Sequence, residues 1–247
     1  MYKRKIMKIL FAVSCAMTAQ QSNAEENWGY QGEKAAKHWA DLDPAFTTCK
    51  TGVNQSPIDI RNSKAINANL IPINIQYHQN SKSIENKGTT VQVNFEPGSQ
   101  ITAEGKTFQL LQVHFHHPSE NYIDGQEYPL SGHFVHQNEN GELAVLNVMF
   151  EEGPENPALA KIWKKIPKKN HKVDFTNVFS GTELLPKTKM YYRFNGSLTT
   201  PPCSEGVRWY VLKTPVVASK AQIDQFEKAI GVNHRPLQFV NARTILK

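Results

Sequence analysis

The stretch Gln112-Val-His-Phe-His116 alternates polar and apolar residues over its five positions. Successive side chains of a β-strand point to opposite faces of the sheet. On a strand, Gln112, His114 and His116 would therefore share one face, and the two apolar residues between them would face the other way. This stretch predicts a strand that carries two imidazoles side by side.

A second strand-like stretch, Leu130-Ser-Gly-His-Phe-Val-His136, follows a connection of about 13 residues. On this strand Val135 shares a face with His133, and His136 lies near the opposite side. The connection contains the turn signal Asp124-Gly125, so the two strands could pair as an antiparallel hairpin. Such pairing would bring His133 next to the two imidazoles of the first strand.

Three neutral imidazoles on rigid strands are a ligand set that suits Zn²⁺. Three protein ligands leave one coordination position open, which is typical of a catalytic zinc site, because structural sites usually supply four. A His-x-His pattern alone is equally explained by hydrogen-bonded histidines of the core or the surface. These stretches therefore indicate a zinc site and leave an ordinary structural role as the alternative.

The rest of the chain contains many short stretches with the same two-residue alternation, separated by turn residues. The predicted strands lie within residues 71–77, 90–95, 109–117, 133–136 and 207–212. One predicted helix begins at Asn156-Pro157 and continues to Ile166, and another begins at the capping box Ser219-Lys-Ala-Gln222 and ends at Gly231. The sequence thus predicts a mainly β single domain with one large sheet and helices at its surface.

Basic residues are concentrated at the start of the chain. The 247 residues carry 28 Lys and Arg against 22 Asp and Glu, a formal net charge of +6, but four of the basic residues lie in the first eight positions. A short apolar stretch and small residues up to Ala24 follow them, which is the pattern of a secretory signal peptide over residues 1–24. Residues 25–247 keep 28 − 4 = 24 basic and 22 acidic side chains, a net charge of about +2. That balance excludes nucleic acid from the expected partners.

Cleavage near Ala24 predicts a periplasmic or secreted protein. An uncleaved amphipathic helix is one alternative, and a lipid-modified N-terminus at Cys15 is another, although Lys8 shortens the apolar run before that cysteine. No later stretch approaches about 18 apolar residues, so we expect no transmembrane span. The mature chain keeps Cys49 and Cys203, an even pair that suggests one disulfide in an exported protein, with two buried free thiols as the alternative.

Four motifs occur in order along the chain: Gln55-Ser-Pro-Ile-Asp-Ile60, Gln112-Val-His-Phe-His-His-Pro-Ser-Glu120, Leu130-Ser-Gly-His-Phe-Val-His136 and Asn195-Gly-Ser-Leu-Thr-Thr-Pro-Pro202. Together they resemble the alpha-class carbonic anhydrases, in particular the exported bacterial branch, from Trp28 to Pro236. The resemblance implies a zinc enzyme that reversibly hydrates carbon dioxide to bicarbonate and a proton. It also implies a catalytic domain over residues 25–247, built on a large twisted, mostly antiparallel central sheet with short peripheral helices.

By resemblance, His114, His116 and His133 hold one Zn²⁺ per chain, and water or hydroxide takes the fourth position. Zinc lowers the pKa of that water to about 7, so that hydroxide can attack carbon dioxide near neutral pH. Thr199 matches the family threonine that accepts a hydrogen bond from the hydroxide. Glu120 matches the carboxylate that receives the threonine's own proton.

Further positions match the family's substrate pocket and the surroundings of its metal. These are Val135, Val145, Leu198, Val207, Trp209 and Thr200 in the pocket, and Gln112, Ser131, Tyr30 and Gln92 around the ligands and the water network. Gln112 can accept the free ring N–H of His114 and so fix its tautomer. Cys49 and Cys203 match a disulfide of many exported members, which would tether the loop that holds Thr199. Plain core packing and turn chemistry are the structural alternatives for such residues.

Three positions depart from the family pattern. Thr89 stands where fast members often have a proton-carrying histidine, and threonine does not titrate near neutral pH, so we expect proton release to limit turnover unless His117 or His78 serves. Ser131 stands where many members have a glutamate that hydrogen-bonds the third zinc histidine, so zinc is expected to bind more weakly. Asn121 replaces a histidine, and the sequence predicts no physical consequence.

Two competing functions fit the same motifs less well. A catalytically silent carbonic-anhydrase-like binding protein would typically lack one or more of the zinc histidines. A zinc carrier would not need a deep three-ligand site on a rigid sheet. The expected partner is the small-molecule substrate, the resemblance implies inhibition by sulfonamides, and a homodimer is compatible with the sequence.

Overall fold

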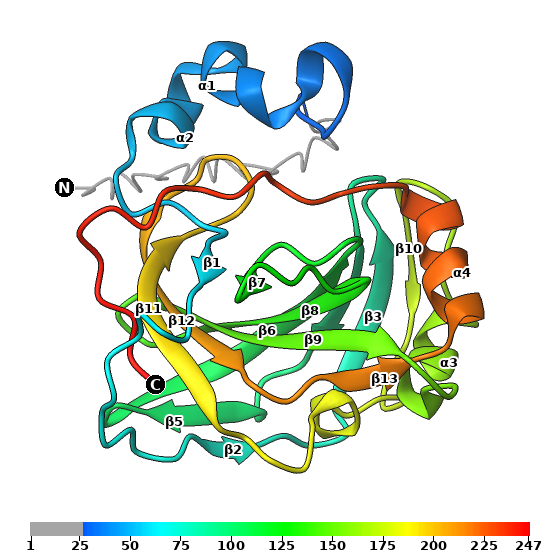
Figure 1. Ribbon diagram of the computed structural model, residues 1–247. Helices are drawn as coiled ribbons and strands as arrows, with labels where there is room; N and C mark the ends of the chain where they lie inside the picture. Colours follow the sequence, from blue (N-terminus) through cyan, green and yellow to red (C-terminus); the bar gives the residue numbers. More distant parts are fainter. Residues whose placement is uncertain (1–26) are drawn as a thin grey trace, which may run out of the picture.

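The computed structural model describes residues 27–247, so the predicted signal peptide and Cys15 lie outside the described residues. Figure 1 shows a large curved sheet with short helices at its margins. Eight of its eleven strands lie in the order β10 (His171–Asp174), β3 (Ser81–Asn86), β4 (Val91–Phe95), β6 (Lys106–His116), β8 (Leu130–Gln137), β9 (Leu143–Glu152), β12 (Glu205–Leu212) and β11 (Tyr191–Ser197).

Three shorter strands, β2 (Asn74–Gln76), β5 (Gln100–Ala103) and β13 (Val216–Ala218), join this sheet off the main path. Neighbouring strands are antiparallel except β12 and β13, which both run parallel to β9. The predicted mainly β single domain with a mostly antiparallel sheet is confirmed. β2 is shorter than the predicted strand over residues 71–77, because Pro72 has no N–H to donate and β2 pairs only with β5 at the sheet's edge.

Both predicted helices lie at the surface, as α3 (Pro157–Trp163) and α4 (Lys220–Ile230). The Asn156 side chain caps α3, and Ser219 and Gln222 form the predicted capping box of α4. α3 ends three residues before its predicted end at Ile166. That residue precedes Pro167, and the residue before a proline is disfavoured in helical conformation.

Short helical turns over residues 32–51, including α1 (Trp39–Leu42) and α2 (Thr48–Thr51), were not predicted. They are too short to show apolar periodicity and depend on tertiary contacts instead. Trp39 is fully buried, and its indole N–H is shared between the backbone oxygens of Gly29 at 2.8 Å and Lys34 at 3.0 Å. In Figure 1 these turns lie above the sheet.

Two apolar clusters pack against the sheet. The larger includes Val113 and Phe115, which alternate with the histidines of β6 and face α3 and α4. The ring of Phe115 lies 4.9 Å from that of Trp163, which in turn lies 5.4 Å from that of Phe226. The smaller cluster includes Val135 and therefore lies on the face that carries the three histidines.

The loop after β6 is fixed by a separate parallel pair, β1 (Asp59–Ile60) with β7 (Tyr122–Ile123).

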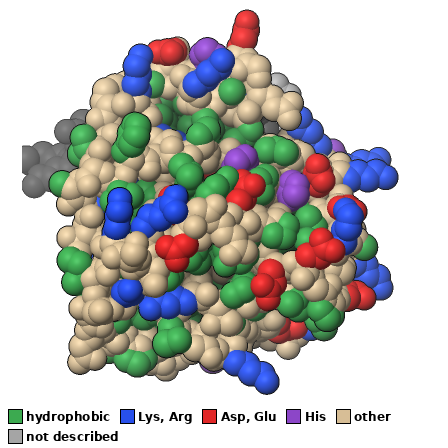
Figure 2. All heavy atoms as spheres, viewed as in Figure 1, with side chains coloured by type: hydrophobic (Ala, Val, Ile, Leu, Met, Phe, Trp, Pro, Cys, Tyr) green, Lys and Arg blue, Asp and Glu red, His purple; other side chains and the backbone are tan. Residues whose placement is uncertain are grey.

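Acidic and basic side chains are interspersed over the face seen in Figure 2. Within residues 27–247, no helix combines the length and apolar character needed to cross a bilayer.

Candidate metal centre

The antiparallel pairing of β6 with β8 brings the three predicted ligands together. His114 lies opposite His133 in the register of the two strands, and His116 lies two residues further along β6 on the same face. Each offers one ring nitrogen, and these nitrogens all lie within 4.8 Å of one another. His116 and His133 are buried, and His114 is half-buried. The predicted hairpin and the predicted convergence of the imidazoles are confirmed.

Protein acceptors hold the other nitrogen of two of these rings. Nδ1 of His114 lies 2.8 Å from Oε1 of Gln112, and Nδ1 of His116 lies 2.7 Å from the backbone oxygen of Asn233. Both oxygens can only accept, so Nδ1 carries the proton in each ring and Nε2 keeps a free lone pair. Nε2 of His116 is buried and has no hydrogen-bond partner among residues 27–247.

Burial keeps the three rings neutral, which is the form that binds a metal. Desolvation lowers the pKa of His116 to about 4. Burial, and after it the charge of neighbouring histidines, lowers the pKa of His114 and of His133 well below the usual 6.5. Near neutral pH the site therefore presents three uncharged imidazoles.

These residues fit a zinc ion. A buried imidazole nitrogen without a partner is costly unless a ligand meets it, and Nε2 of His116 is such an atom. Neutral imidazoles suit Zn²⁺ better than the hard cations Mg²⁺ and Ca²⁺, which prefer oxygen. With three ligands supplied by the chain, one position stays open for a reacting molecule.

Glu120 is fully buried beside the three rings. Its Oε1 accepts the backbone N–H of Arg235 at 2.9 Å, and its Oε2 lies 3.5 Å from Nε2 of His116 and 3.8 Å from Nδ1 of His133. Because the rings are neutral, these contacts are not ion pairs. Burial raises the pKa of the Glu120 carboxyl to about 7, against a hydrogen bond from Thr199 that lowers it. The structure thus brings together the two residues predicted to orient the reacting oxygen.

Arg235 connects this carboxyl to the N-terminal part of the chain. Its guanidinium donates to Oε1 of Gln55 and to the backbone oxygen of Ser56, both at 2.8 Å, and to the backbone oxygen of Cys49 at 2.9 Å. It also lies 5.6 Å from the ring centre of Trp39. A single buried side chain therefore fixes the segment around Cys49 against the metal centre.

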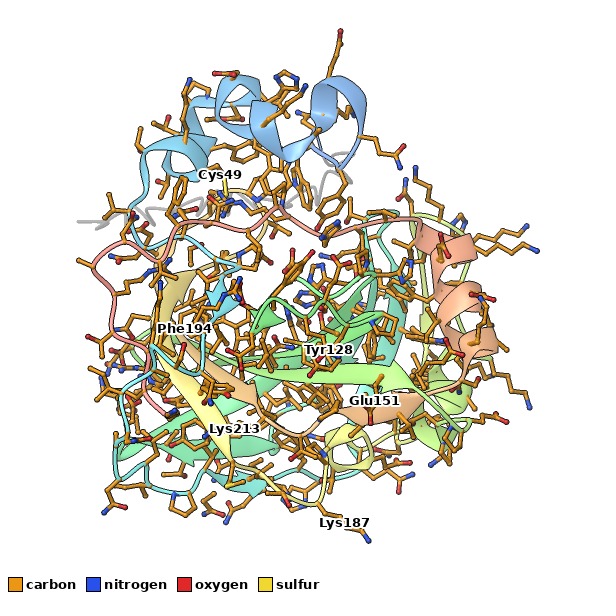
Figure 3. The ribbon with its side chains drawn as sticks, viewed as in Figure 1. Cys49, Tyr128, Glu151, Lys187, Phe194 and Lys213 are labelled. Atoms are coloured by element: carbon orange, nitrogen blue, oxygen red, sulfur yellow. A yellow bond between two sulfur atoms is a disulfide. The ribbon has the colours of Figure 1, made fainter. Side chains whose placement is uncertain are left out.

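The predicted disulfide between Cys49 and Cys203 is confirmed and spans 154 residues of sequence. Cys49 lies in α2 and is labelled in Figure 3, at the lower edge of the N-terminal helical segment. The N–H of Cys203 donates to the backbone oxygen of Thr200 at 2.9 Å, and its own oxygen accepts the side-chain amide of Gln55 at 3.0 Å. The disulfide and these two hydrogen bonds therefore hold the turn that follows Thr199 in place.

The residues predicted as an apolar wall lie together in the smaller core cluster. They are Val135, Val145, Val207 and Trp209, with Leu198 packed against them. The Trp209 ring meets that of His133 edge-on, with the ring centres 5.0 Å apart. The apolar cluster thus borders the third histidine.

A cavity of about 150 Å³ opens over His114 and His116. Its lining includes Gln112, Gln92 and Tyr30, three of the four residues predicted around the ligands and the water network, and the proton-carrier position Thr89. Of the residues predicted in the substrate pocket, its lining includes Thr200. The two alternative proton carriers do not line it. His117 binds the backbone oxygen of Pro129 through Nδ1, and His78 is exposed on the turn after β2.

Ser131 does not take over the hydrogen bond that the family's glutamate makes to the third histidine. Ser131 Oγ and His133 Nε2 are both buried, and neither has a partner in the described part of the chain. A serine hydroxyl on a short stem does not reach a ring two residues along the same strand. Asn121, whose effect the sequence left open, donates to Oδ1 of Asn147 at 3.1 Å and accepts the N–H of Ile58 at 3.0 Å.

Sequence reasoning missed Asn233 and Arg235. Besides holding His116, the buried Asn233 donates through its amide to the backbone oxygens of Thr89 at 2.8 Å and Phe115 at 2.9 Å. Both residues lie in a segment after α4 without regular secondary structure, so no periodicity marked them. Their only signal was the short string Asn233-His-Arg-Pro236.

A mainly β domain with three neutral histidines converging from adjacent strands defines a zinc protein with an open, catalytic type of site. The chain belongs to the eukaryotic-type carbonic anhydrase family, whose family profile matches residues 34–247. A carbonic anhydrase of Pectobacterium carotovorum is 45% identical over 242 residues, which cover 97% of this chain and 98% of the relative.

Solved structures agree with this assignment. An α-carbonic anhydrase from Thermovibrio ammonificans, in complex with the inhibitor sulfanilamide, superposes with a TM-score of 0.87 at 45% identity and covers 89% of this chain and 98% of its own. The α-carbonic anhydrase of Photobacterium profundum gives a TM-score of 0.84 at 48% identity, covering 89% of this chain and 100% of its own. The resemblance stated from the four sequence motifs is confirmed.

Proposed function

We propose that this protein interconverts carbon dioxide and bicarbonate at a zinc ion held by His114, His116 and His133. The observation that carries the proposal is the convergence of three neutral imidazoles, of which His114 and His116 line a cavity and His133 contacts Trp209 of the apolar cluster. When bound there, zinc lowers the pKa of a water molecule to about 7 and so supplies hydroxide near neutral pH. The competing binding protein without catalysis would lack part of this ligand set, and here the set is complete.

Thr199 and Glu120 act as an orienting pair in this proposal. The Thr199 hydroxyl lowers the pKa of the buried Glu120 carboxyl, and in this proposal it donates its proton to that carboxylate. Its hydroxyl oxygen is then left as an acceptor, so it favours a reacting oxygen that donates a proton and disfavours ligands that cannot. The N–H of Arg235 donates to Oε1 of Glu120 at 2.9 Å and keeps the carboxylate in place.

The apolar wall supports the choice of substrate. Carbon dioxide is small and has no hydrogen-bond donor, so an apolar surface beside the metal can receive it without orienting contacts. The side chains that would form this surface pack together next to His133: Val135, Val145, Leu198, Val207 and Trp209. Thr200 lies at the boundary between the wall and the cavity. Tyr30, Gln92 and Gln112 surround the opening and would order the water around the metal.

The test combines zinc content with stopped-flow hydration of carbon dioxide, with and without a sulfonamide. We expect one zinc per chain and hydration that a sulfonamide suppresses, in keeping with the sulfanilamide complex of the Thermovibrio relative. A zinc-loaded protein without sulfonamide-sensitive hydration would overturn the enzyme function. A Thr199→Val variant should keep its zinc and lose most of its hydration rate.

Proton release is the proposed slow step, because Thr89 occupies the position of the family's proton carrier. We expect Thr89→His, or added imidazole buffer, to raise the maximal hydration rate about tenfold, since general acid–base groups contribute at least this much. The matched control is Thr107→His, an exposed threonine on β6 that does not line the cavity. An unchanged maximal rate for both Thr89→His and added imidazole would show that proton release is not limiting.

We also propose that residues 1–24 are removed on export and that residues 25–247 form the mature periplasmic or secreted enzyme. The disulfide fits an oxidising compartment, because such bonds are rare in the cytosol. N-terminal sequencing of protein from a periplasmic extract should begin at Glu25, and an N-terminus at Met1 would refute the cleavage. The homodimer remains a prediction that sedimentation can test.

A further inference from the structure

A second cavity, of about 370 Å³, adjoins the one over the metal centre. The two cavities share four lining residues: Trp28, Tyr30, Lys87 and Thr89. We call this second cavity the vestibule. Its walls come from the start of the described chain, the β3–β4 turn, the turn before β10 and the end of α4, which meet at the upper right of Figure 1.

The charge in the vestibule is of one sign. Lys34, Lys87 and Lys169 line it, and none of its twelve lining residues is Asp or Glu. Within residues 27–247, no carboxylate lies within 4.0 Å of any of these three ammonium groups. Three like charges on separate segments repel one another unless an anion is shared between them. A concave site lined by one sign of charge concentrates the opposite ion from solution.

The β3–β4 turn is held rigidly enough to present its lysine. Lys87 N–H donates to the backbone oxygen of Thr90 at 3.0 Å, and Gly88 N–H donates to Oδ1 of Asn86 at 2.9 Å. The backbone oxygen of Asn86 in turn accepts the N–H of Asn170 at 2.7 Å. The turns that carry Lys87 and Lys169 are therefore fixed to each other.

The absence of a side chain at Gly88 makes room for the Lys169 side chain to lie over the β3–β4 turn. The φ of Gly88 is +78°, and a Cβ placed on it would lie 2.5 Å from Cε of Lys169. The Lys169 side chain thus lies directly over Gly88, one residue before Thr89. Lys87 lines both cavities, and Lys169 lies over the residue next to Thr89, which also lines both.

We propose that the vestibule binds a small oxyanion, hydrogen phosphate or bicarbonate, beside the entrance to the metal centre. The inference rests on the proposed function, since that reaction turns a neutral gas into an oxyanion and a proton. Both ions present several acceptor oxygens on a compact anion, which suits ammonium groups arriving from three segments. A volume of about 370 Å³ holds either ion together with its water.

A bound hydrogen phosphate would also accept the proton that Thr89 cannot carry. An O–H bond of a water molecule at the reaction centre would break and leave hydroxide there, and the proton would pass through water to the phosphate. One O–H bond forms on the phosphate, and HPO₄²⁻ becomes H₂PO₄⁻. The product has lost one negative charge, so the lysines hold it more weakly and it exchanges with solution. Bicarbonate leaving or entering the site would use the same charges without accepting the proton.

The binding arm of the test uses inorganic phosphate and the zinc-loaded protein at constant ionic strength. The amide resonances of Gly88 and Asn170 should shift with saturation in the millimolar range. In Lys87→Gln combined with Lys169→Gln, binding should weaken about tenfold, because two nearby charges are removed. The matched control is Lys64→Gln combined with Lys164→Gln, an equal loss of charge at two exposed lysines that line neither cavity.

The kinetic arm separates the two ions. Hydration is measured with phosphate and with imidazole as proton acceptor, and dehydration is measured against bicarbonate. A saturation constant for phosphate that rises about tenfold in the vestibule variant, with imidazole little affected, identifies the phosphate role. A KM for bicarbonate that rises instead identifies the product role. Either result supports the oxyanion site.

Absence of saturable phosphate binding, or equal weakening in the vestibule and control variants, would overturn the inference. Failure of the proposed function would be seen differently. In that case no sulfonamide-sensitive hydration would occur even with imidazole, whereas the amide resonances would still report whether phosphate binds. The two conclusions can therefore fail independently.

Discussion

His133 and His136 lie three residues apart on β8 and face opposite sides of the sheet. His133 faces the other two zinc ligands. His136 faces the larger core cluster, where its Nε2 lies 2.7 Å from the hydroxyl of Tyr77 and its Nδ1 lies 3.2 Å from the backbone oxygen of Ala144. The same residue type on the same strand thus serves a metal centre on one face and the core on the other.

Neither burial nor charge distinguishes the two rings. Both are almost fully buried, and desolvation lowers the pKa of both, to about 4 for His136. The difference lies in their partners. Both nitrogens of His136 have neighbours that donate or accept, whereas Nδ1 of His133 points toward the ring of His116 and the carboxylate of Glu120. A histidine can serve as a metal ligand where the fold leaves one ring nitrogen without a hydrogen-bond donor and directs it toward the ring nitrogens of other histidines.

The largest effect is expected when the same substitution is made on each face. His133→Gln replaces one of three imidazoles by an amide, which is a poor ligand for Zn²⁺. Hydration should fall at least about 1,000-fold, because zinc-activated water is lost. Zinc content by atomic absorption should drop to a small fraction of one per chain after dialysis.

His136→Gln is the matched control for this change. Its amide lies on the other face of β8, so the protein should keep its zinc and its hydration rate while losing stability. Loss of zinc in both variants to the same extent would show that the two faces are not independent. Full zinc occupancy in His133→Gln would remove that residue from the ligand set.

The pH dependence of stability should reveal the core histidine. Burial holds the folded pKa of His136 at about 4, below 6.5 in the unfolded chain, so the unfolded state binds the proton first as pH falls. Its contribution is complete above pH 6.5 and is lost between pH 6.5 and 4, in total about 3 kcal/mol. Urea unfolding across this range should give a steeper decline for the wild type than for His136→Gln. Metal release on acidification affects both proteins and cancels in the difference, so parallel curves would contradict the assignment.

A smaller effect should follow from restoring a charged partner to His133. Ser131 Oγ and His133 Nε2 both lack partners, so a longer acidic side chain could accept the ring N–H. Ser131→Glu should slow zinc transfer to a chelator about tenfold, at the lower end of such outer partners. Ser131→Gln has the same length without the charge and separates packing from electrostatics. Equal rates of zinc release from the wild type and from Ser131→Glu would reject the idea that the serine at this position weakens zinc binding.

Part of this fold was predictable, because buried and less buried residues alternate along most of β6 and its sequence alternates with them. β8 is buried on both faces and alternates less regularly. The alternation fixed which residues share a face, and the turn signals made the antiparallel pairing plausible. The short helices over residues 32–51 were not predictable, since each is shorter than two helical turns and Trp39 is anchored by distant backbone oxygens. Tertiary contacts, which no local pattern encodes, determine such segments.

The metal ligands were predictable for the same reason, whereas their supports were not. Gln112 shares the face of His114 two residues away, so its role followed from the strand period. Asn233 reaches His116 from 117 positions along the chain, out of a segment with no period. The vestibule was unpredictable for the same reason, because its lysines come from three segments that are distant in sequence and meet only in the folded chain.

The smallest expected effect concerns the partner of His136. Tyr77→Phe keeps the ring that stacks on Phe134 at 5.8 Å but removes the hydroxyl that lies 2.7 Å from His136 Nε2. The free energy of unfolding should fall by about 1 kcal/mol, the net value of one buried hydrogen bond. Zinc content and hydration should not change, because the substitution touches only the core face of β8. A variant that releases zinc faster would mean that the core contacts of β8 help to hold the metal centre in place. The two faces of the strand would then be separate in their contacts but coupled in their energies.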